Sequence, residues 1–286
     1  MSQHPLRRLA IVSAVAALAL GLVSCSSVDT SGSSSAALSD SELDTVTPGV
    51  LTIATSEPAY SPYVEDDDPT TGEGFESAVA YAVAEKLGYS ADEVEWVRED
   101  FDASITPGAK DWDLNIQQFS ITDERKQAVD FSSPYYTATQ AVVTYAGSPA
   151  DGATTIADLT SVKFGVQAAT TSLTTLQDAI APEQEISQFN SNADAIAALK
   201  NKQVDAIVLD LPTAIYEVNV DLDDGVIVGQ LESDGDSDQF GIVLPKDSSL
   251  TDAVTEAVDE LQADGTLDEL AQTWLNTNGV SIPFLQ

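Results

Sequence analysis

Residues 120–125 read Ser-Ile-Thr-Asp-Glu-Arg, and they follow the apolar, strand-like segment 113–117. Thr122 is a good helix N-cap, and the two acidic residues that follow it are favourable in a first helical turn. The pattern predicts a short helix that holds Arg125 just beyond the end of a strand. Ligands bind at this place in open α/β sheets, and a guanidinium there can hold a carboxylate through two parallel bonds. The alternative is that Arg125 pairs with a neighbouring carboxylate of this acidic chain.

The segments on both sides of this motif alternate between strand-like and helix-like patterns. Residues 50–53 form a short β-branched strand, and residues 75–87 repeat apolar side chains at helical spacing before Gly88. Such alternation predicts an α/β protein with mostly parallel sheets. Further strands are expected at 94–97, 113–117, 140–145, 162–167, 186–189, 206–209, 226–228 and 240–244, and further helices at 171–181, 193–202, 212–218, 250–261 and 267–275.

The charge and composition of the chain exclude several functions. Its 286 residues include 11 Lys+Arg and 47 Asp+Glu, which gives a formal net charge of −36. Such a chain repels phosphate backbones, so we expect no binding to nucleic acid. The single His and the single Cys are His4 and Cys25, so the rest of the chain cannot form a Cys/His zinc site, a Ser-His-Asp triad or a Cys-His dyad. We expect no cofactor and no metal, because the loop Asp234–Asp238 lacks the further acidic residue of an EF-hand calcium loop.

The N-terminus suggests a role for the single cysteine. Arg7 and Arg8 precede the apolar run Leu9–Leu22, which is short for a membrane span and is followed closely by Cys25. The pattern resembles the lipobox of bacterial lipoproteins, and an ordinary signal peptide with an incidental cysteine is the alternative. We expect a lipoprotein signal peptide at 1–24 and a lipidated, Ser-rich tether at 25–47. The protein would then be extracytoplasmic and anchored to the cell membrane only through Cys25.

Two further segments carry groups suited to a charged ligand. Thr170 and Thr171 lie between an expected strand and a helix start, where hydroxyls and backbone N–H groups suit an anion; a simply capped helix is the alternative. Asp210 follows an apolar strand and could accept bonds from an ammonium group or cap the next helix. A zwitterion needs one cationic and one anionic partner, and Arg125 with Asp210 would supply both.

Together these motifs resemble the extracellular solute-binding proteins of ABC importers for polar amino acids, known as family 3, over about residues 48–280. The resemblance implies a type II periplasmic-binding-protein-like fold, in which two α/β lobes are joined by two hinge strands. It implies a monomer that captures a polar amino acid between the lobes and delivers it to the permease subunits. The motifs that carry the resemblance are Glu57 to Tyr63, Gly74-Phe75-Glu76, Ser120 to Arg125, Asp130 to Tyr136 and Asp264 to Trp274. The implied division is 48–142 with 241–286 in lobe 1, and 143–240 in lobe 2.

The resemblance also implies roles for individual residues. Arg125 matches the arginine that holds the ligand α-carboxylate, and Asp210 matches the aspartate that takes the α-ammonium. Ala169 stands where the family usually has glycine. The other implied contacts are Ser120, Thr170 and Thr171 near the carboxylate, Tyr60 and Phe101 on the two faces of the ligand, Gln118 near the ammonium, and Gln117 and Glu57 near the side chain.

Two other functions are compatible with the same fold. An enzyme, such as a dehydratase or a glycan-cleaving enzyme, could use Glu57 or Glu76 as a general acid. A lipid-anchored sensor or receptor would bind amino acids without an importer. The paired Arg125 and Asp210 favour binding without catalysis. Glu57, Gln117 and Gln118 favour a polar side chain on the ligand, which could be that of Gln, Glu, His or a basic amino acid.

Overall fold

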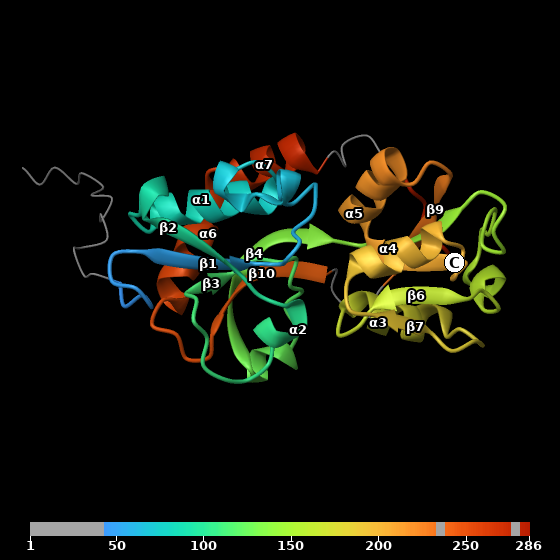
Figure 1. The fold of residues 1–286 in the computed structure, drawn as a ribbon, viewed down its shortest axis with the longest axis horizontal. Helices are drawn as coiled ribbons and strands as arrows, with labels where there is room; N and C mark the ends of the chain where they lie inside the picture. Colours follow the sequence, from blue (N-terminus) through green and yellow to red (C-terminus); the bar gives the residue numbers. More distant parts are fainter. Residues whose placement is uncertain (1–42, 233–237, 276–280) are drawn as a thin grey trace, which may run out of the picture. The chain divides into compact units, whose positions relative to one another are not determined.

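Two mixed sheets, each of five strands, form the framework of the described chain. The computed structural model describes residues 43–232, 238–275 and 281–286, and these residues belong to one compact unit. The first sheet has the strand order β2-β1-β3-β10-β4 (Figure 1). Its strands are β1 (Leu51–Thr55), β2 (Val94–Arg98), β3 (Leu114–Asn115), β4 (Val129–Ala138) and β10 (Asp238–Pro245).

The second sheet has the strand order β7-β6-β8-β5-β9. In both sheets two neighbouring pairs are parallel and two are antiparallel, whereas the sequence predicts mostly parallel sheets. The difference arises where the chain changes sheet. Only Thr139 separates β4 from β5, and a direct passage of this kind needs no helical crossover. The strands are β5 (Gln140–Tyr145), β6 (Phe164–Gln167), β7 (Ser187–Phe189), β8 (Ala206–Asp210) and β9 (Gly225–Leu231).

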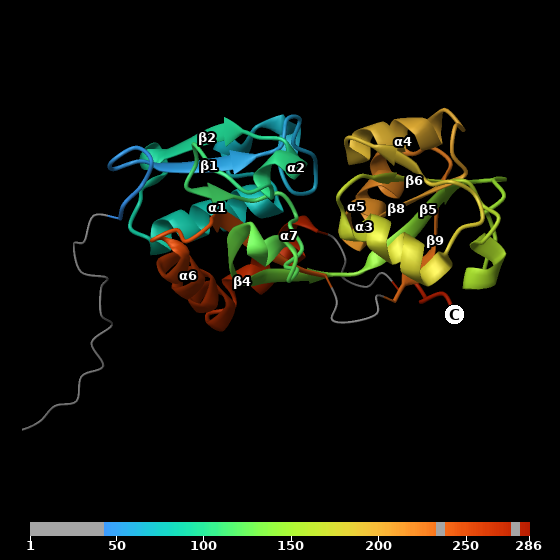
Figure 2. The ribbon, with the colours of Figure 1, turned by 90° about the horizontal axis from the view of Figure 1, so that it is seen from below.

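The first sheet is covered on both faces. Helices α1 (Phe75–Lys86), α6 (Thr251–Ala263) and α7 (Thr266–Trp274) share one apolar core with alternate strand residues such as Ile53, and they lie together (Figure 2). Ala54 belongs instead to a separate cluster that includes Trp112 and Phe119. Alternate residues of β1 therefore enter different cores, which explains why its apolar run is continuous.

The second sheet is buried in the same way. Its helices are α3 (Thr171–Thr175), α4 (Asn192–Lys200) and α5 (Leu211–Tyr216). In β5, Val142 packs in one core cluster while Ala141 and Val143 pack in another. These two cores fix α3, α4 and α5 against the strands, and so fix the loops between them.

Several elements differ from the sequence prediction. The helices expected at 171–181 and 212–218 each end early and continue as π-helical turns, Leu176–Ile180 and Glu217–Asp221. Strand β4 was not predicted as a strand, and its pairing with β10 shifts register twice, so its apolar pattern does not alternate regularly. Short 3-10 turns lie at Glu65–Asp67, Pro69–Thr71, Ala91–Glu93, Arg125–Gln127 and Ile156–Leu159.

The last residues pack against the second sheet, although the resemblance implies that 241–286 belongs with the first. Gln230 donates its backbone N–H to the oxygen of Pro283 at 2.8 Å, and Leu285 donates to Gln230 at 2.9 Å. The side chain of Leu285 enters the core of the second sheet. The physical reason is Gly229, because a Cβ at that position would lie 2.7 Å from Leu285.

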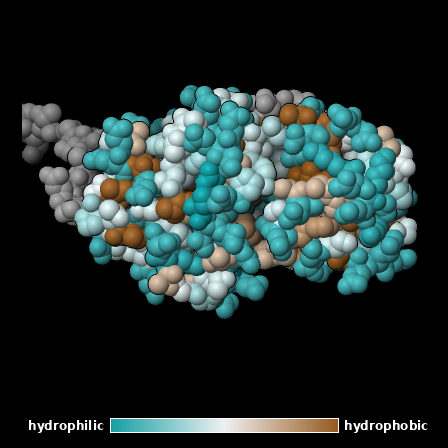
Figure 3. All heavy atoms as spheres, in the orientation of Figure 1, coloured by the Kyte–Doolittle hydropathy of each residue, from teal (hydrophilic) through white to brown (hydrophobic). Residues whose placement is uncertain are grey.

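The expected signal peptide, Cys25 and most of the Asp234–Asp238 loop lie outside the described residues. Among the residues that are described, no helix has the length and apolar character needed to cross a membrane. The face of the molecule in Figure 3 is mainly hydrophilic, as expected from the excess of carboxylates.

Candidate functional site

A cavity of about 110 Å³ collects all of the site residues that the sequence predicts. Its walls come from loops that follow strands of both sheets. Among the residues that line it are Glu57, Tyr60, Phe101, Gln117, Gln118, Ser120, Arg125, Thr170, Thr171 and Asp210. We call this space the head cavity.

Arg125 is a buried cation in this cavity, with 8% of its surface exposed. Thr122 accepts a hydrogen bond from the backbone N–H of Arg125 at 3.1 Å. The helical turn nevertheless begins at Arg125 with Glu124 as its N-cap, and not with Thr122 as the sequence predicts. The guanidinium donates to the backbone oxygens of Ser120 at 2.7 Å and Ala169 at 2.9 Å. Within the described part of the chain, no ion pair includes Arg125. Burial lowers the pKa of Arg125, whereas Asp238 and Asp210 act against that shift, and the group stays protonated.

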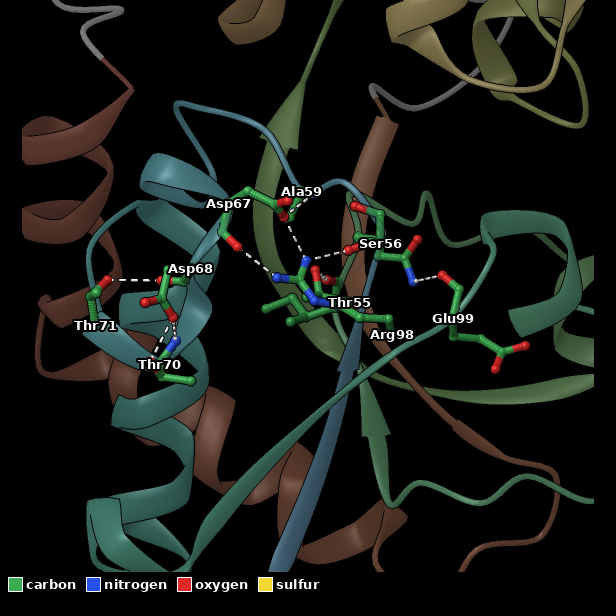
Figure 4. Close-up of polar contacts among 11 residues, drawn as sticks. Thr55, Ser56, Ala59, Asp67, Asp68, Thr70, Thr71, Arg98 and Glu99 are labelled. Carbon is green, nitrogen blue, oxygen red and sulfur yellow. Dashed lines mark hydrogen bonds and ion pairs between the residues drawn. The ribbon is translucent and has the colours of Figure 1, made fainter.

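Arg98 behaves as a lone arginine in an acidic chain commonly does. Its guanidinium pairs with the Asp67 carboxylate at 2.8 Å and donates to the backbone oxygen of Ser56 at 2.6 Å (Figure 4). The same carboxylate accepts the N–H of Ala59 at 2.8 Å. Arg98 thus ties the loop that carries Glu57 to a neighbouring acidic turn. The contrast shows that the general expectation of ion pairing holds for Arg98 and not for Arg125.

Asp210 lies at the carboxyl end of β8 and lines the head cavity. Its side chain makes no capping bond to the helix that follows, and it instead accepts a bond from the Gln140 amide at 2.7 Å. The amide oxygen of Gln140 accepts a hydrogen bond from the Ser172 hydroxyl at 2.7 Å. Burial raises the pKa of Asp210 to about 7, with Asp238 adding to the shift and Gln140 opposing it. Asp210 is therefore a poorly solvated carboxyl that an ammonium group would stabilise in its charged form.

The hydroxyl groups of the cavity connect its two sides. Ser120 and Thr171 lie 3.0 Å apart, oxygen to oxygen. Thr170 caps α3 by accepting the N–H of Leu173 at 3.2 Å. Ala169, in place of the glycine common in the resembling family, adopts a φ of 59°. An alanine therefore takes the left-handed conformation at this turn, and its carbonyl still receives the Arg125 bond.

The aromatic residues occupy different situations. Phe101 stacks on Phe119 with ring centroids 4.6 Å apart, and the Arg125 guanidinium lies 5.4 Å from the centre of the Phe101 ring. Tyr60 is 39% exposed. Phe101 is thus packed between Phe119 and the Arg125 guanidinium, whereas Tyr60 is more open to solvent.

The two glutamines face different partners. Gln118 donates both its backbone N–H, at 2.7 Å, and its side-chain amide to Glu76. Gln117 donates to Asn115 at 2.8 Å, while its amide oxygen is buried without a hydrogen-bond partner. Gln117 lines the head cavity, and a buried acceptor without a partner is uncommon in a folded protein.

Sequence reasoning missed two supporting residues. Glu76 is fully buried and accepts bonds from Gln118 and from the Tyr135 hydroxyl; burial raises its pKa to about 7. The sequence marks Glu76 as part of the Gly74-Phe75-Glu76 motif and as a candidate general acid, but not as the partner of Gln118. Gln140, which holds Asp210, was missed altogether because its partners Asp210 and Ser172 are distant in sequence, although an unpaired polar residue at the start of an apolar strand is a usable signal.

Comparison with known proteins places this arrangement in a family. The model of the bacterial extracellular solute-binding proteins, family 3, matches residues 51–277. A "Probable histidine-binding protein" of Campylobacter jejuni is 32% identical over 91% of this chain and 95% of its own length. The arginine-binding extracellular protein ArtP of Bacillus subtilis is 31% identical over 70% of this chain and 77% of its own. A solved ancestral arginine-binding protein with bound arginine has a TM-score of 0.67 and 31% identity, covering 79% of this chain and 98% of that one. The chain belongs to the bacterial extracellular solute-binding proteins, family 3.

Proposed function

We propose that the protein binds an amino acid in the head cavity, with Arg125 on the α-carboxylate and Asp210 on the α-ammonium. The observation that carries the proposal is that Arg125 is buried beside the cavity with carbonyl partners only, among the described residues. A carboxylate there would supply the missing counter-charge through charge-assisted bonds. Asp210, on the wall of the same cavity, supplies the opposite charge.

The charges around the head cavity favour a ligand with a basic side chain. Glu57, Glu99, Asp100 and Asp210 line it, against the single guanidinium of Arg125. After the ligand head group neutralises Arg125 and Asp210, carboxylates remain in excess. The relatives named for histidine and arginine agree with this preference.

The wider setting follows from the same proposal. The bound amino acid would be delivered to the permease of an ABC importer, and the protein would be held at the outer face of the cell membrane by a lipid on Cys25. The two lobes would be built around the two sheets, with the ligand closing them on each other. We expect binding without turnover, and turnover of a prephenate-like acid or of cell-wall glycan would contradict this.

A thermal-shift screen of the twenty amino acids and cystine tests the proposal. A ligand that binds only the folded protein raises the melting temperature by linkage, by an amount that grows with its concentration. We expect at least one basic amino acid to give such a rise. The absence of a shift with every compound at millimolar concentration would contradict amino-acid binding.

A further inference from the structure

A second cavity, of about 150 Å³, adjoins the head cavity. The two spaces share Tyr60, Gln118 and Asn192 as walls. The rest of the second cavity is formed chiefly by α4 and α5, with Ile196, Thr213 and Glu217 among its lining residues. We call it the tail cavity.

The wall of the tail cavity includes a carboxyl group, that of Glu217, with one oxygen that lacks a hydrogen-bond partner. Glu217 is only 5% exposed, and its Oε2 atom is buried with no hydrogen-bond partner. The nearby cation Lys200 is 3.9 Å from Asp221, and none of the ion pairs among the described residues includes Glu217. Burial raises the pKa of Glu217 to about 7, and Asp221 adds to the shift. Lys200, which also lines the tail cavity, opposes this shift. A buried carboxyl oxygen without a hydrogen-bond partner is costly for the fold, which favours a donor supplied from outside the chain.

The position of Glu217 relates the tail cavity to the head cavity. Asp210 is the N-cap of α5, Thr213 lies within α5, and Glu217 begins the π-helical turn that continues it. Their spacings of three and four residues are those of neighbours on one side of a helix. Seven residues correspond to about 10 Å along a helix axis. Asp210 lines the head cavity and Glu217 lines the tail cavity, so a ligand whose head group lies at Asp210 would extend its side chain toward Glu217.

The walls of the tail cavity suit a cationic end group on an aliphatic stem. Its volume of about 150 Å³ equals several waters, each of which occupies about 30 Å³ in the liquid. Ile196 and Ala197 provide apolar surface for methylene groups, and Tyr60 and Tyr63 provide aromatic rings on which a cation is attracted. Burial raises the pKa of Tyr60, and the carboxylates Asp194, Asp67 and Glu217 add to the shift, so these groups make the local field negative.

We propose that the tail cavity binds the side-chain ammonium or guanidinium of a basic amino acid, with Glu217 as its counter-ion. This inference rests on the proposed function, because it assumes that Arg125 and Asp210 hold the ligand head. It assigns to Glu217 the choice between basic and neutral amino acids. The carboxylates of the head cavity, Glu57 among them, then act at longer range.

The test compares arginine and glutamine binding by calorimetry at pH 8, where Glu217 is ionised. In the unmodified protein arginine binds more tightly than glutamine. Glu217→Gln weakens arginine ten- to a hundredfold, as expected for one charge-assisted bond, and changes glutamine affinity less than threefold. Glu256→Gln on α6, which removes one exposed carboxylate, changes neither. Ile196→Phe fills the tail cavity and weakens arginine while glutamine still binds.

Three results would overturn the inference. Arginine affinity could be unchanged in Glu217→Gln, it could fall in Glu57→Gln instead, or the unmodified protein could prefer glutamine. An unmodified protein that binds neither these two compounds nor any other compound of the thermal-shift screen would contradict the proposed function itself, which distinguishes the two failures.

Discussion

Arg125 and Ala169 join the two halves of the cavity, since the guanidinium donates to the Ala169 backbone oxygen at 2.9 Å. Arg125 precedes β4 of the first sheet, and Ala169 follows β6 of the second. The hydroxyls of Ser120 and Thr171 meet beside this contact at 3.0 Å. The two halves of the head cavity can separate only if both contacts break. Arg125, which we propose binds the ligand carboxylate, therefore also helps to hold the cavity closed.

Replacing Arg125 with alanine should abolish tight binding of every amino acid. The ligand carboxylate would be left desolvated and unpaired, at a cost of about 3 kcal/mol or roughly a hundredfold in affinity. Isothermal calorimetry measures this directly. Arg98→Ala is the matched control, because it removes the other arginine of the described residues and the bond to Ser56 but leaves Arg125 in place. We expect it to weaken binding less than tenfold. Equal losses in the two variants would count against the clamp.

Asp210→Asn should weaken amino acids more than ligands that lack the ammonium group. The asparagine keeps the size of the side chain and can still contact Gln140, so the cavity should stay intact. We expect about a tenfold or greater loss for an amino acid and little change for the matching carboxylic acid without an amine. A parallel loss for both compounds would show that Asp210 acts on the cavity shape rather than on the ammonium.

Amino-acid affinity should fall as the pH decreases below about 7. Burial raises the pKa of Asp210 to about 7 in the free protein, so the carboxyl is largely protonated at lower pH. An ammonium group binds the charged form, so binding releases a proton and affinity drops about tenfold per pH unit below the pKa. Calorimetry in buffers of different ionisation enthalpy measures the number of protons released when the amino acid binds. Affinity that is constant from pH 8 to 5.5 would contradict the role of Asp210.

Stability of the ligand-free protein should decrease as the pH rises from about 4 to about 7. The pKa values of Glu76, Asp210 and Glu217 are each raised to about 7 in the fold, so the folded chain binds more protons than the unfolded chain over roughly pH 4 to 7. The free energy of unfolding then falls as pH rises through this window. Repulsion within the acidic surface acts in the same direction. Urea unfolding at several pH values provides the measurement.

Glu76→Gln should reduce that pH dependence by about one proton. The glutamine carries no charge, yet it retains one oxygen to accept bonds from Gln118 or Tyr135. Glu76→Ala leaves these donors unsatisfied and should destabilise the fold by about 1–3 kcal/mol. An unchanged pH profile in Glu76→Gln would show that the Glu76 carboxyl does not titrate in this range.

The sequence was sufficient to predict which segments meet at the head cavity. The Ser120–Arg125 turn and Asp210 could be predicted as parts of the site, because ligands bind where strands of an α/β sheet end and helices begin. Thr170 and Thr171 were predicted from their place at a helix start, and the resemblance supplied Tyr60 and Phe101. All ten predicted site residues line one cavity, although their contacts with a ligand are still a prediction.

Other features depend on contacts that local patterns do not encode. Gln140 holds Asp210 and Ser172, which lie 70 and 32 residues away. Glu217 reads as one more acidic residue on a solvated helix, and only its burial against α4 and Tyr60 distinguishes it. Leu285 returns to the second sheet because Gly229 leaves room for it, a steric fit that composition does not show.

The most direct test of the proposed head site is a comparison of L-arginine with agmatine, its analogue without the α-carboxylate, by calorimetry on the unmodified protein and on Arg125→Ala. We predict that arginine binds the unmodified protein at least a hundredfold more tightly than agmatine does, and that Arg125→Ala removes this difference. Equal affinity of the two compounds for the unmodified protein would contradict the claim that Arg125 binds the ligand carboxylate.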